Sequence, residues 1–364
     1  MRPEIQKSKL MVIKIGSNVL TKEDGKPDLA RMASLVKQVS FLRENGKKVI
    51  LVSSGAVAFG RKEITLPEKI DPILKKQIWA SAGQIELINT YKNLFRELGI
   101  TISQILVTKE DFRDRKHYLN MKNCLLGLLS QDIVPIVNEN DTVAITELMF
   151  TDNDELASLT AAMVNADTLI LLTNVDGVFD GPPSDPTSKL IPHIGTKMPD
   201  LDHVISPIKS SFGRGGMLTK LSMAKKSADL GIQVLIANGK KENILLDFHE
   251  KSITCTYFEP KPSKQSPKKW LAHGDQYFKG EVIINEGAKT ALFSQNISSL
   301  LPVGILEIKG DFSKGDIIRI LDVEGNKLGL GRAEISSKTA LETIGQKNQK
   351  PFIHYDYLYL FNHV

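Results

Sequence analysis

The sequence predicts an α/β protein, in which a mostly parallel sheet is sandwiched by helices and a small β-barrel-like domain follows. Strand-like and helix-like segments alternate from Leu10 to about Phe258. Three prolines and four lysines without periodicity then occupy residues 259–269, which is typical of a linker. Short strand-like runs separated by glycine-bearing turns come after it. We therefore expect domains at 1–259 and 272–364, joined by a linker at 260–271.

Apolar runs and helical spacing assign the individual elements. Asp28 begins one helix with apolar residues three and four apart, and Asp71 with Pro72 gives a second helix a cap and a first-turn proline. The predicted strands of the first domain are 10–15, 49–52, 101–108, 134–137, 168–173 and, as the last, 234–237. The predicted helices are 28–43, a short one after 56, 71–98, 118–131, one opened by 151–155, and one after 220. The second domain has strand-like runs at 280–284, 304–309, 316–321 and 327–332.

Composition places the chain among ordinary soluble globular proteins, since 41% of its 364 residues are hydrophobic and 24% are charged. Its net charge of +5 does not call for a nucleic-acid partner. No apolar run approaches the roughly 18 residues of a membrane span, and no apolar leader precedes the first strand, so we expect a cytoplasmic protein. Cys124 and Cys255 are too far apart in sequence for a metal motif, and no disulfide is expected.

Two clusters of Asn and Asp lie about ten residues apart. Asn138 to Asp141 follow the apolar run 134–137, and Thr151 to Glu155 open a helix. Ligands of open α/β sheets bind at the carboxyl ends of strands and beside helix N-termini. Amide and carboxylate groups together suit an amino acid, which carries an ammonium group and a carboxylate. The alternative is structural: Asp152 with Glu155 resembles a capping box, and Asn and Asp are common in turns.

Three further segments have the features of an anion site. Lys14 lies inside a buried strand, where a lysine is costly unless it is paired or meets an anion, although it could also extend to the surface at the strand end. The turn Ser53-Ser54-Gly55-Ala56 exposes backbone N–H groups after the second strand. The segment 213–220 combines glycines, Arg214 and Lys220 before a helix, without the spacing of a Walker A loop.

These motifs, in this order along nearly the whole chain, resemble the amino acid kinase family. The set comprises Lys14-Ile-Gly-Ser, Ser53-Ser-Gly-Ala, Asn138-Glu-Asn-Asp, Asp152-Asn-Asp, Leu172-Thr-Asn-Val-Asp-Gly-Val-Phe and Gly215-Gly-Met-Leu-Thr-Lys. The Asn138-Glu-Asn-Asp and Asp152-Asn-Asp motifs, together with the C-terminal segment, are similar to those of bacterial glutamate 5-kinases in particular. The C-terminal segment resembles a PUA domain, with Gly280-Glu-Val, Ser299-Leu-Leu-Pro-Val-Gly and Phe312-Ser-Lys-Gly-Asp.

The resemblance implies ATP-dependent phosphorylation of the γ-carboxylate of L-glutamate, in the first step of proline synthesis, with proline as a feedback inhibitor. It implies that Lys14 and Lys220 neutralise charge on the transferring phosphoryl group and that Asp154 holds them. Mg²⁺ would ride on the phosphates, so no protein metal ligand is expected. A homo-oligomer, dimer or tetramer, is expected. The implied glutamate-binding residues are Ser54, Asn138, Asp141, Asp152 and Asn153. The implied ATP-binding residues are Lys14, Thr173, Asn174, Arg214, Gly215, Gly216, Met217, Leu218, Thr219 and Lys220.

Two residues of this sequence depart from the pattern of the family. Asn174 stands where the family often has Asp, and Arg214 where it often has Thr.

Another member of the family, acting on acetylglutamate, aspartate or carbamate, is the first alternative function. The C-terminal segment argues against it. The second is an RNA-binding protein, as other PUA proteins are. Residues 272–364 hold ten Lys and Arg against eleven Asp and Glu, which is not the basic face that phosphate contacts need.

Overall fold

The structure is a computed structural model that describes residues 5–143, 150, 152–196, 217–250, 253–261, 278–294 and 298–361. The chain divides into two compact units, made mainly of residues 1–263 and of residues 264–364. Each unit has its own sheet, of eight and of five strands. The predicted α/β class with a separate C-terminal β domain is therefore confirmed. Residues 262–271 of the predicted linker lie outside the described residues, so the linker boundaries stay a prediction.

The sheet of the first unit has the strand order β3-β4-β2-β1-β5-β7-β8-β6. The six strands from β3 to β7 in this order are parallel, β8 runs antiparallel to β7, and β6 is parallel to β8. The strands are β1 (Leu10–Ile15), β2 (Lys48–Ser53), β3 (Ile102–Val107), β4 (Val134–Glu139), β5 (Thr168–Thr173), β6 (His193–Ile194), β7 (Gln233–Asn238) and β8 (Cys255–Phe258).

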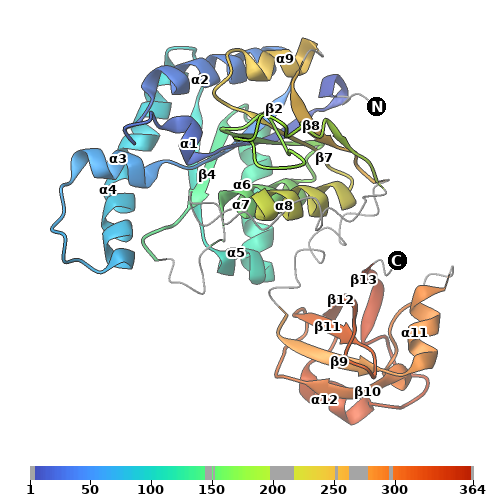
Figure 1. Cartoon of the computed structure of the whole chain (residues 1–364). Coiled ribbons are helices and arrows are strands. Elements are labelled where there is room, and N and C mark those ends of the chain that lie inside the picture. Colours follow the sequence, from blue (N-terminus) through green and yellow to red (C-terminus); the bar gives the residue numbers. More distant parts are fainter. Residues whose placement is uncertain are drawn as a thin grey trace. The chain divides into compact units, whose positions relative to one another are not determined.

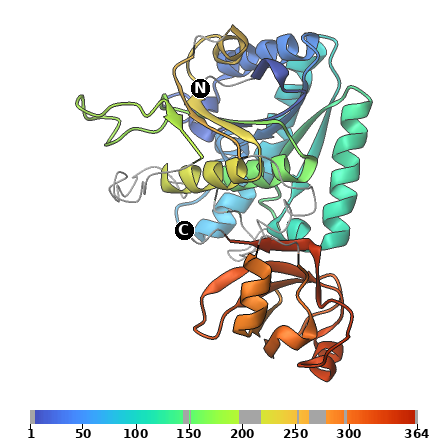
Figure 2. The same cartoon turned by 90° about the vertical axis from the view of Figure 1, so that its right-hand side faces the viewer.

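Helices cover both faces of this sheet (Figures 1 and 2). Met11, Ile13 and Ile15 of β1 pack in one core with residues of α2, α4 and α9, whereas α7 and α8 lie against the other face. Because side chains alternate along a strand, Lys14 points to the face that α7 covers. The helices are α1 (Ser17–Leu20), α2 (Leu29–Glu44), α3 (Ala56–Glu63), α4 (Pro72–Arg96), α5 (Lys109–Arg113), α6 (Arg115–Ser130), α7 (Asn153–Val164), α8 (Met217–Asp229) and α9 (Ile244–Glu250).

Most of the predicted elements of this unit are confirmed, including the predicted Asp71 cap and the helix start at Asp28, which is also a cap. The Asp28 carboxylate accepts the N–H of Arg31, and that of Asp71 accepts the N–H groups of Ile73 and Leu74. Two predictions are wrong. The strand expected to end at 137 continues through 139, because those residues pair with β3. The strand at 234–237 is not the last of this unit, since α9 and then β8 follow it. Both α9 and β8 are too short to show a clear hydrophobic periodicity in the sequence.

The second unit is a five-stranded sheet in the order β10-β9-β11-β12-β13, with a small core that includes Val282, Ile320 and Phe352. The four predicted strands are confirmed, but β13 and two helices were not predicted. Its elements are β9 (Gly280–Ile284), α11 (Glu286–Phe293), β10 (Ile305–Lys309), β11 (Ile317–Leu321), β12 (Lys327–Ala333), α12 (Ser337–Thr343) and β13 (Ile353–Leu360).

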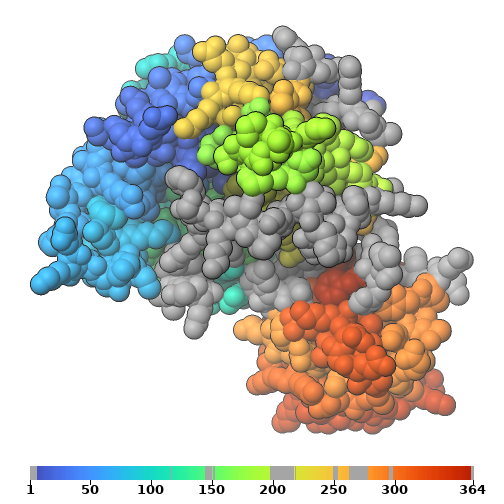
Figure 3. Space-filling view, in the orientation of Figure 1, coloured from blue at the N-terminus to red at the C-terminus, as the bar shows by residue number. Residues whose placement is uncertain are grey.

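The long connection between β5 and β6 lies on the molecular surface, where Figure 3 shows it in bright green. Most side chains from 180 to 190 in this proline-rich stretch are exposed. Among the described helices, none is both long enough and apolar enough to cross a bilayer.

The helices α3 and α4 touch backbone to backbone at two glycines. A Cβ atom on Gly83 would lie 1.9 Å from the carbonyl oxygen of Ala56, and one on Gly60 would lie 1.8 Å from that of Trp79. Such distances exclude any side chain at either position. Since α3 begins just after the β2 turn, this contact fixes where α4 lies relative to the carboxyl end of β2.

We expect Gly83→Ala to lower the free energy of unfolding by about 3 kcal/mol, the upper end for overpacking, because a backbone atom is displaced. Gly127→Ala is a matched control, since Gly127 is an exposed helical glycine whose Cβ would meet no atom within 4 Å. That change should stabilise by about 0.5–1 kcal/mol through helix propensity. Urea denaturation measures both variants, and equal effects at the two positions would contradict the close α3–α4 contact.

Candidate active site

The predicted site residues meet along one edge of the sheet, because the parallel strands that carry them all end there. Across the sheet, the order is Asn138 on β4, Ser54 after β2, Lys14 on β1 and Thr173 on β5. The chain leaves β1 towards β2 on one side, and β5 lies on the other, which makes β1 the switch point of the sheet. Ligands of open α/β sheets bind outside the carboxyl ends of strands at such a point.

Two lysines from distant parts of the chain converge on one buried carboxylate. The Nζ atom of Lys14 lies 2.6 Å from Oδ1 of Asp154, and Lys220, in the first turn of α8, donates to its Oδ2. Asp152 lies beside them, 3.7 Å from Lys14 and 3.2 Å from Lys220. The side chains of Lys14 and Asp154 are 4% and 1% exposed, while Lys220 is 13% exposed. The cluster thus has one buried side and one open side, where Lys220 lies.

The charges in this cluster hold one another ionised. Burial by itself raises the pKa of Asp154, but the ammonium groups of Lys14 and Lys220 outweigh burial and hold that pKa well below its usual range. Burial acts to lower the pKa of Lys220, but the carboxylates of Asp154 and Asp152 more than offset it and raise that pKa. At neutral pH the site therefore presents a fixed ammonium group at its open side.

The capping-box alternative for the α7 N-terminus is wrong. Asp152 is the N-cap residue by position, but its side chain makes no capping hydrogen bond and instead lies beside the two lysines. Glu155, the other half of the expected box, forms an ion pair of 3.2 Å with Lys109 at the start of α5. The Asp152 side chain therefore faces the lysines and does not cap the helix.

A chain of amide and hydroxyl groups runs from α4 to β2 across the carboxyl end of β4. The amide of Gln84 accepts a hydrogen bond from Asn138 at 2.8 Å. Asn153 donates to Oδ1 of Asn138 at 3.2 Å and to Oγ of Ser54 at 2.8 Å. Three predicted residues are thereby brought together. Gln84 was not predicted, since nothing in the spacing of α4 distinguishes it from a surface glutamine.

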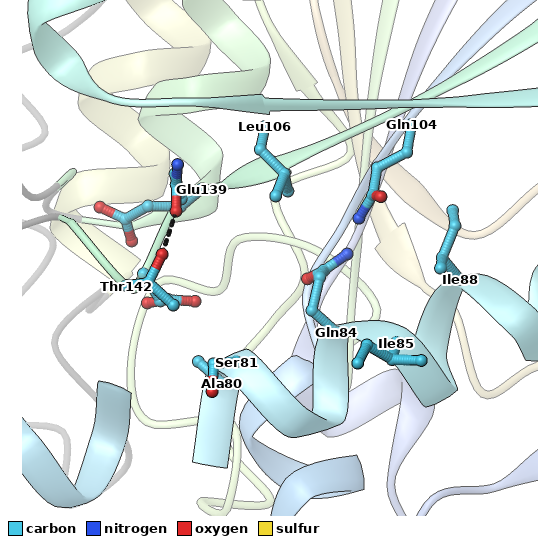
Figure 4. A pocket seen from close by; sticks show the side chains of 11 residues that line it. Ala80, Ser81, Gln84, Ile85, Ile88, Gln104, Leu106, Glu139 and Thr142 are labelled. Carbon is cyan, nitrogen blue, oxygen red and sulfur yellow. Dashed lines mark hydrogen bonds between the residues drawn. The ribbon is translucent and has the colours of Figure 1, made fainter. Parts of the chain in front are cut away.

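A pocket of about 290 Å³ extends from this chain of amides (Figure 4). Gln84 and Gln104 point towards one another across it, with Ile85, Ile88 and Leu106 nearby. Its remaining lining residues are Ala80, Ser81, Glu139, Asn140, Asp141 and Thr142. The pocket is thus apolar towards α4 and polar towards the turn after β4.

Asp141 lies in this pocket but already has a cationic partner. Its Oδ1 atom lies 2.6 Å from Nζ of Lys76 on α4. The neighbouring Gln77 donates to the carbonyl oxygen of Thr142 at 3.3 Å. Lys76 was not predicted, because a lysine in the second turn of a long amphipathic helix is usually a solvated one.

Glu139 is a second buried carboxyl group in the pocket. Burial raises its pKa to about 7, and the negative charge of Asp141 adds to this, against the Phe150 N–H and the positive charges of Lys76 and Lys109. The Phe150 N–H donates to its Oε1 atom at 2.8 Å. This carboxyl group therefore changes its charge near neutral pH, unlike Asp154.

The other side of β1 holds the residues predicted to bind ATP. The Thr173 hydroxyl donates to Asn174 at 3.3 Å, and Asn174 is exposed. Asp176 accepts from Asn238 at 3.0 Å and lies 2.7 Å from Lys241. Met217, Leu218, Thr219 and Lys220 form the first turn of α8, while Arg214, Gly215 and Gly216 lie outside the described residues. In the described part of the chain, no three His, Cys, Asp or Glu side chains are grouped as metal ligands.

The raised pKa of Glu139 predicts how stability changes with pH. The folded state keeps this proton up to about pH 7, whereas an unfolded glutamate loses it near 4.5. The contribution of Glu139 to stability is thus full below pH 4.5 and is lost as the pH rises through 7. Glu139→Gln keeps a hydrogen-bond acceptor for the Phe150 N–H but removes the group that titrates. The free energy of unfolding of this variant, relative to that of the wild type, should therefore be higher at pH 8 than at pH 5.5. Chemical denaturation at the two pH values measures this, and an equal difference at both would contradict it.

Comparison with known proteins agrees with this geometry. Residues 9–238 match the amino acid kinase family, and residues 280–352 match the PUA domain. The chain is 50% identical to a glutamate 5-kinase of Bacteroides thetaiotaomicron over 353 residues, which cover 96% of this chain and 98% of that protein. It is 49% identical to a glutamate 5-kinase of Chlorobaculum tepidum, over 96% and 97% of the two chains.

Among solved structures, the fold is similar to that of UMP kinase from Ureaplasma parvum, with a TM-score of 0.50 and 21% sequence identity. That match covers 70% of this chain and 99% of the other, and it concerns the fold alone. Together with the converging lysines and the parallel sheet, the matches place this chain among kinases: it belongs to the amino acid kinase family and carries a C-terminal PUA domain.

Proposed function

We propose that this kinase transfers the γ-phosphoryl group of ATP to the γ-carboxylate of L-glutamate, as the first step of proline synthesis. The observation that carries the proposal is the position of the Lys14, Asp154 and Lys220 cluster on the switch-point strand. Polar groups suited to an amino acid lie on one side of it, and the predicted nucleotide residues on the other. The relatives named glutamate 5-kinase, which match nearly the whole chain, support this substrate.

The proposed reaction requires little covalent chemistry from the protein itself. A γ-carboxylate oxygen attacks the γ-phosphorus of ATP, the bond from phosphorus to the β–γ bridging oxygen breaks, and ADP leaves with that electron pair. The products are L-glutamyl 5-phosphate and ADP. Since a carboxylate is already ionised at neutral pH, no general base is needed. What remains is to align two anions and to offset the charge that shifts to the leaving group.

Lys14 and Lys220 are the groups that offset this charge. Each is held by Asp154, so both ammonium groups stay at fixed positions before the substrates arrive. Preorganised donors of this kind stabilise a transition state without a cost of reorganisation. Asp154 therefore acts as a positioning residue, and its buried carboxylate need not touch either substrate.

On the acceptor side, the geometry supports Ser54, Asn138 and Asn153 as ligands of glutamate, because they already form one hydrogen-bonded chain. Asp141 at the end of that side is the acceptor for the ammonium group of the amino acid. Asp152 lies beside both lysines and is proposed as a further ligand of glutamate.

On the nucleotide side, Thr173, Asn174 and the first turn of α8 are the proposed ATP ligands. The N-terminus of α8 favours phosphate by its dipole. Mg²⁺ would enter with ATP on its phosphates and supply further charge neutralisation there. Inhibition by proline and assembly into a homo-oligomer remain predictions, as does the cytoplasmic location expected from the sequence.

A coupled assay of ADP release tests the proposal. We compare L-glutamate, L-aspartate and N-acetyl-L-glutamate at equal concentration. L-Glutamate should be the substrate with the largest kcat/KM. Preference for either of the other two acids would overturn the proposed acceptor and leave the kinase assignment in place.

We expect Lys220→Ala and Lys14→Ala each to lower kcat by about 10²–10³, as the loss of one preorganised donor typically does. The KM for glutamate should change little, because the lysines act on charge that develops in the transition state. Replacing either lysine by arginine should keep little of the wild-type kcat, because a planar guanidinium group does not replace the compact charge of an ammonium group. Steady-state kinetics measure these effects, and far-UV circular dichroism should be unchanged.

Lys225→Ala is the matched control, because Lys225 is an exposed lysine on the same helix as Lys220. It should leave kcat within about twofold. If kcat of Lys220→Ala or Lys14→Ala stays within a few-fold of the wild type, that lysine has no catalytic role.

We expect Asp141→Asn to raise the KM for L-glutamate by at least about tenfold, since a charge-assisted bond to an ammonium group is lost. The KM for ATP should stay within about twofold, and inhibition by proline should weaken in parallel if proline shares the acceptor site. Initial-rate kinetics with each substrate varied in turn provide the measurement. Equal increases in both KM values would show that Asp141 serves the structure and not the acceptor.

A further inference from the structure

The ion pair between Lys76 and Asp141 joins α4 to the turn after β4. Its atoms are 2.6 Å apart, and the side chains are 36% and 12% exposed. The hydrogen bond from Gln77 to the Thr142 carbonyl oxygen holds the same turn from the next residue of α4. The ammonium group of Lys76 therefore lies directly beside Asp141, the carboxylate of the pocket lining that is proposed to receive the substrate.

The charges of the substrate bear on what this lysine does. An amino acid carries its ammonium group and its α-carboxylate on the same carbon atom. If the ammonium group binds Asp141, the α-carboxylate is brought next to the cation that Asp141 already faces. Alternating charges at short distances attract, whereas an α-carboxylate left beside Asp141 alone would be repelled.

The position along the sheet agrees with this orientation. Asp141 lies two residues beyond the end of β4, and β4 is separated from β1 by β2 alone. Two strand spacings amount to roughly 10 Å. The α-groups of the substrate are thus held at β4, and its γ-carboxylate extends towards Lys14 on β1. Lys14 and Lys220 are placed at that end of the substrate, and Lys76 lies at the other.

We propose that Lys76 is a specificity-determining residue that binds the α-carboxylate of the amino acid substrate, so that Lys76 and Asp141 together recognise its zwitterionic end. This inference rests on the proposed glutamate kinase function. Without substrate the two side chains neutralise each other. Binding exchanges their one ion pair for two, one with each charge of the substrate.

The test compares Lys76→Met with the wild type on two ligands that differ only at the α-carboxylate. L-Glutamate carries it, and L-isoglutamine has a neutral carboxamide in its place, with the same ammonium group and γ-carboxylate. We measure the KM for L-glutamate and the inhibition constant of L-isoglutamine against L-glutamate. Any change that Lys76→Met causes in Asp141 affects both ligands alike, so the ratio of the two constants isolates the α-carboxylate.

In Lys76→Met, the KM for L-glutamate should rise about 10- to 100-fold, as the loss of a hydrogen bond to a charged group predicts. The inhibition constant of L-isoglutamine should change less than about threefold, as should the KM for ATP. Lys75→Met is the matched control, because Lys75 is the adjacent lysine of α4 and its ammonium group lies 5.0 Å from the ring centre of Trp79. It should leave both constants unchanged.

An equal loss for both ligands would overturn the inference and show that Lys76 only holds Asp141 in place. A lower KM for L-glutamate would also overturn it, since Lys76 would then compete with the substrate ammonium group. A wild type that does not phosphorylate L-glutamate would instead refute the proposed function. The thermal midpoint of each variant, measured in parallel, separates these outcomes from a loss of folded protein.

Discussion

The arrangement of the site depends on one buried carboxylate. Asp154 lies in the first turn of α7, at the face of the sheet that Lys14 reaches, and it pairs with a second lysine from the first turn of α8. A buried ion needs partners, and without them its burial would cost several kcal/mol. The ion pairs of Asp154 therefore hold β1, α7 and α8 together at the point where phosphoryl transfer is proposed. The same ion pairs leave both ammonium groups fixed before any substrate binds.

The acceptor side is held by different forces, namely neutral hydrogen bonds and close backbone packing. The amide chain from Gln84 to Ser54 crosses from α4 to β2. Its two ends keep their spacing because Gly60 and Gly83 let α3 and α4 touch. Fold and function are thus joined at this point, since a methyl group inserted between two helices would displace side chains that are proposed to bind the substrate.

Much of this could be predicted from the sequence, and the exceptions have physical reasons. Lys14 stood out because a charged residue in an apolar strand requires a partner, and Asp152 to Asp154 because acidic residues open a helix. Lys76 and Gln84 did not, since their roles depend on how α4 is rotated about its axis, which is a tertiary property. Strand β4 was predicted too short because polar residues that face a site are indistinguishable in sequence from those of a turn. The contribution of Arg214, Gly215 and Gly216 to the site stays a prediction.

The order of strands across the sheet also has a consequence for how substitutions combine. The groups proposed for the acceptor lie at β4, β2, α4 and the start of α7, and those proposed for the nucleotide lie on β5 and α8, with β1 as the strand between β2 and β5. From β4 to β5 there are three strand spacings, roughly 14 Å. At such separations the free-energy effects of two substitutions add when the two residues share no contact partner. Acceptor preference can therefore diverge among related sequences through changes on one half of the sheet, while the nucleotide half and its central strand are inherited intact.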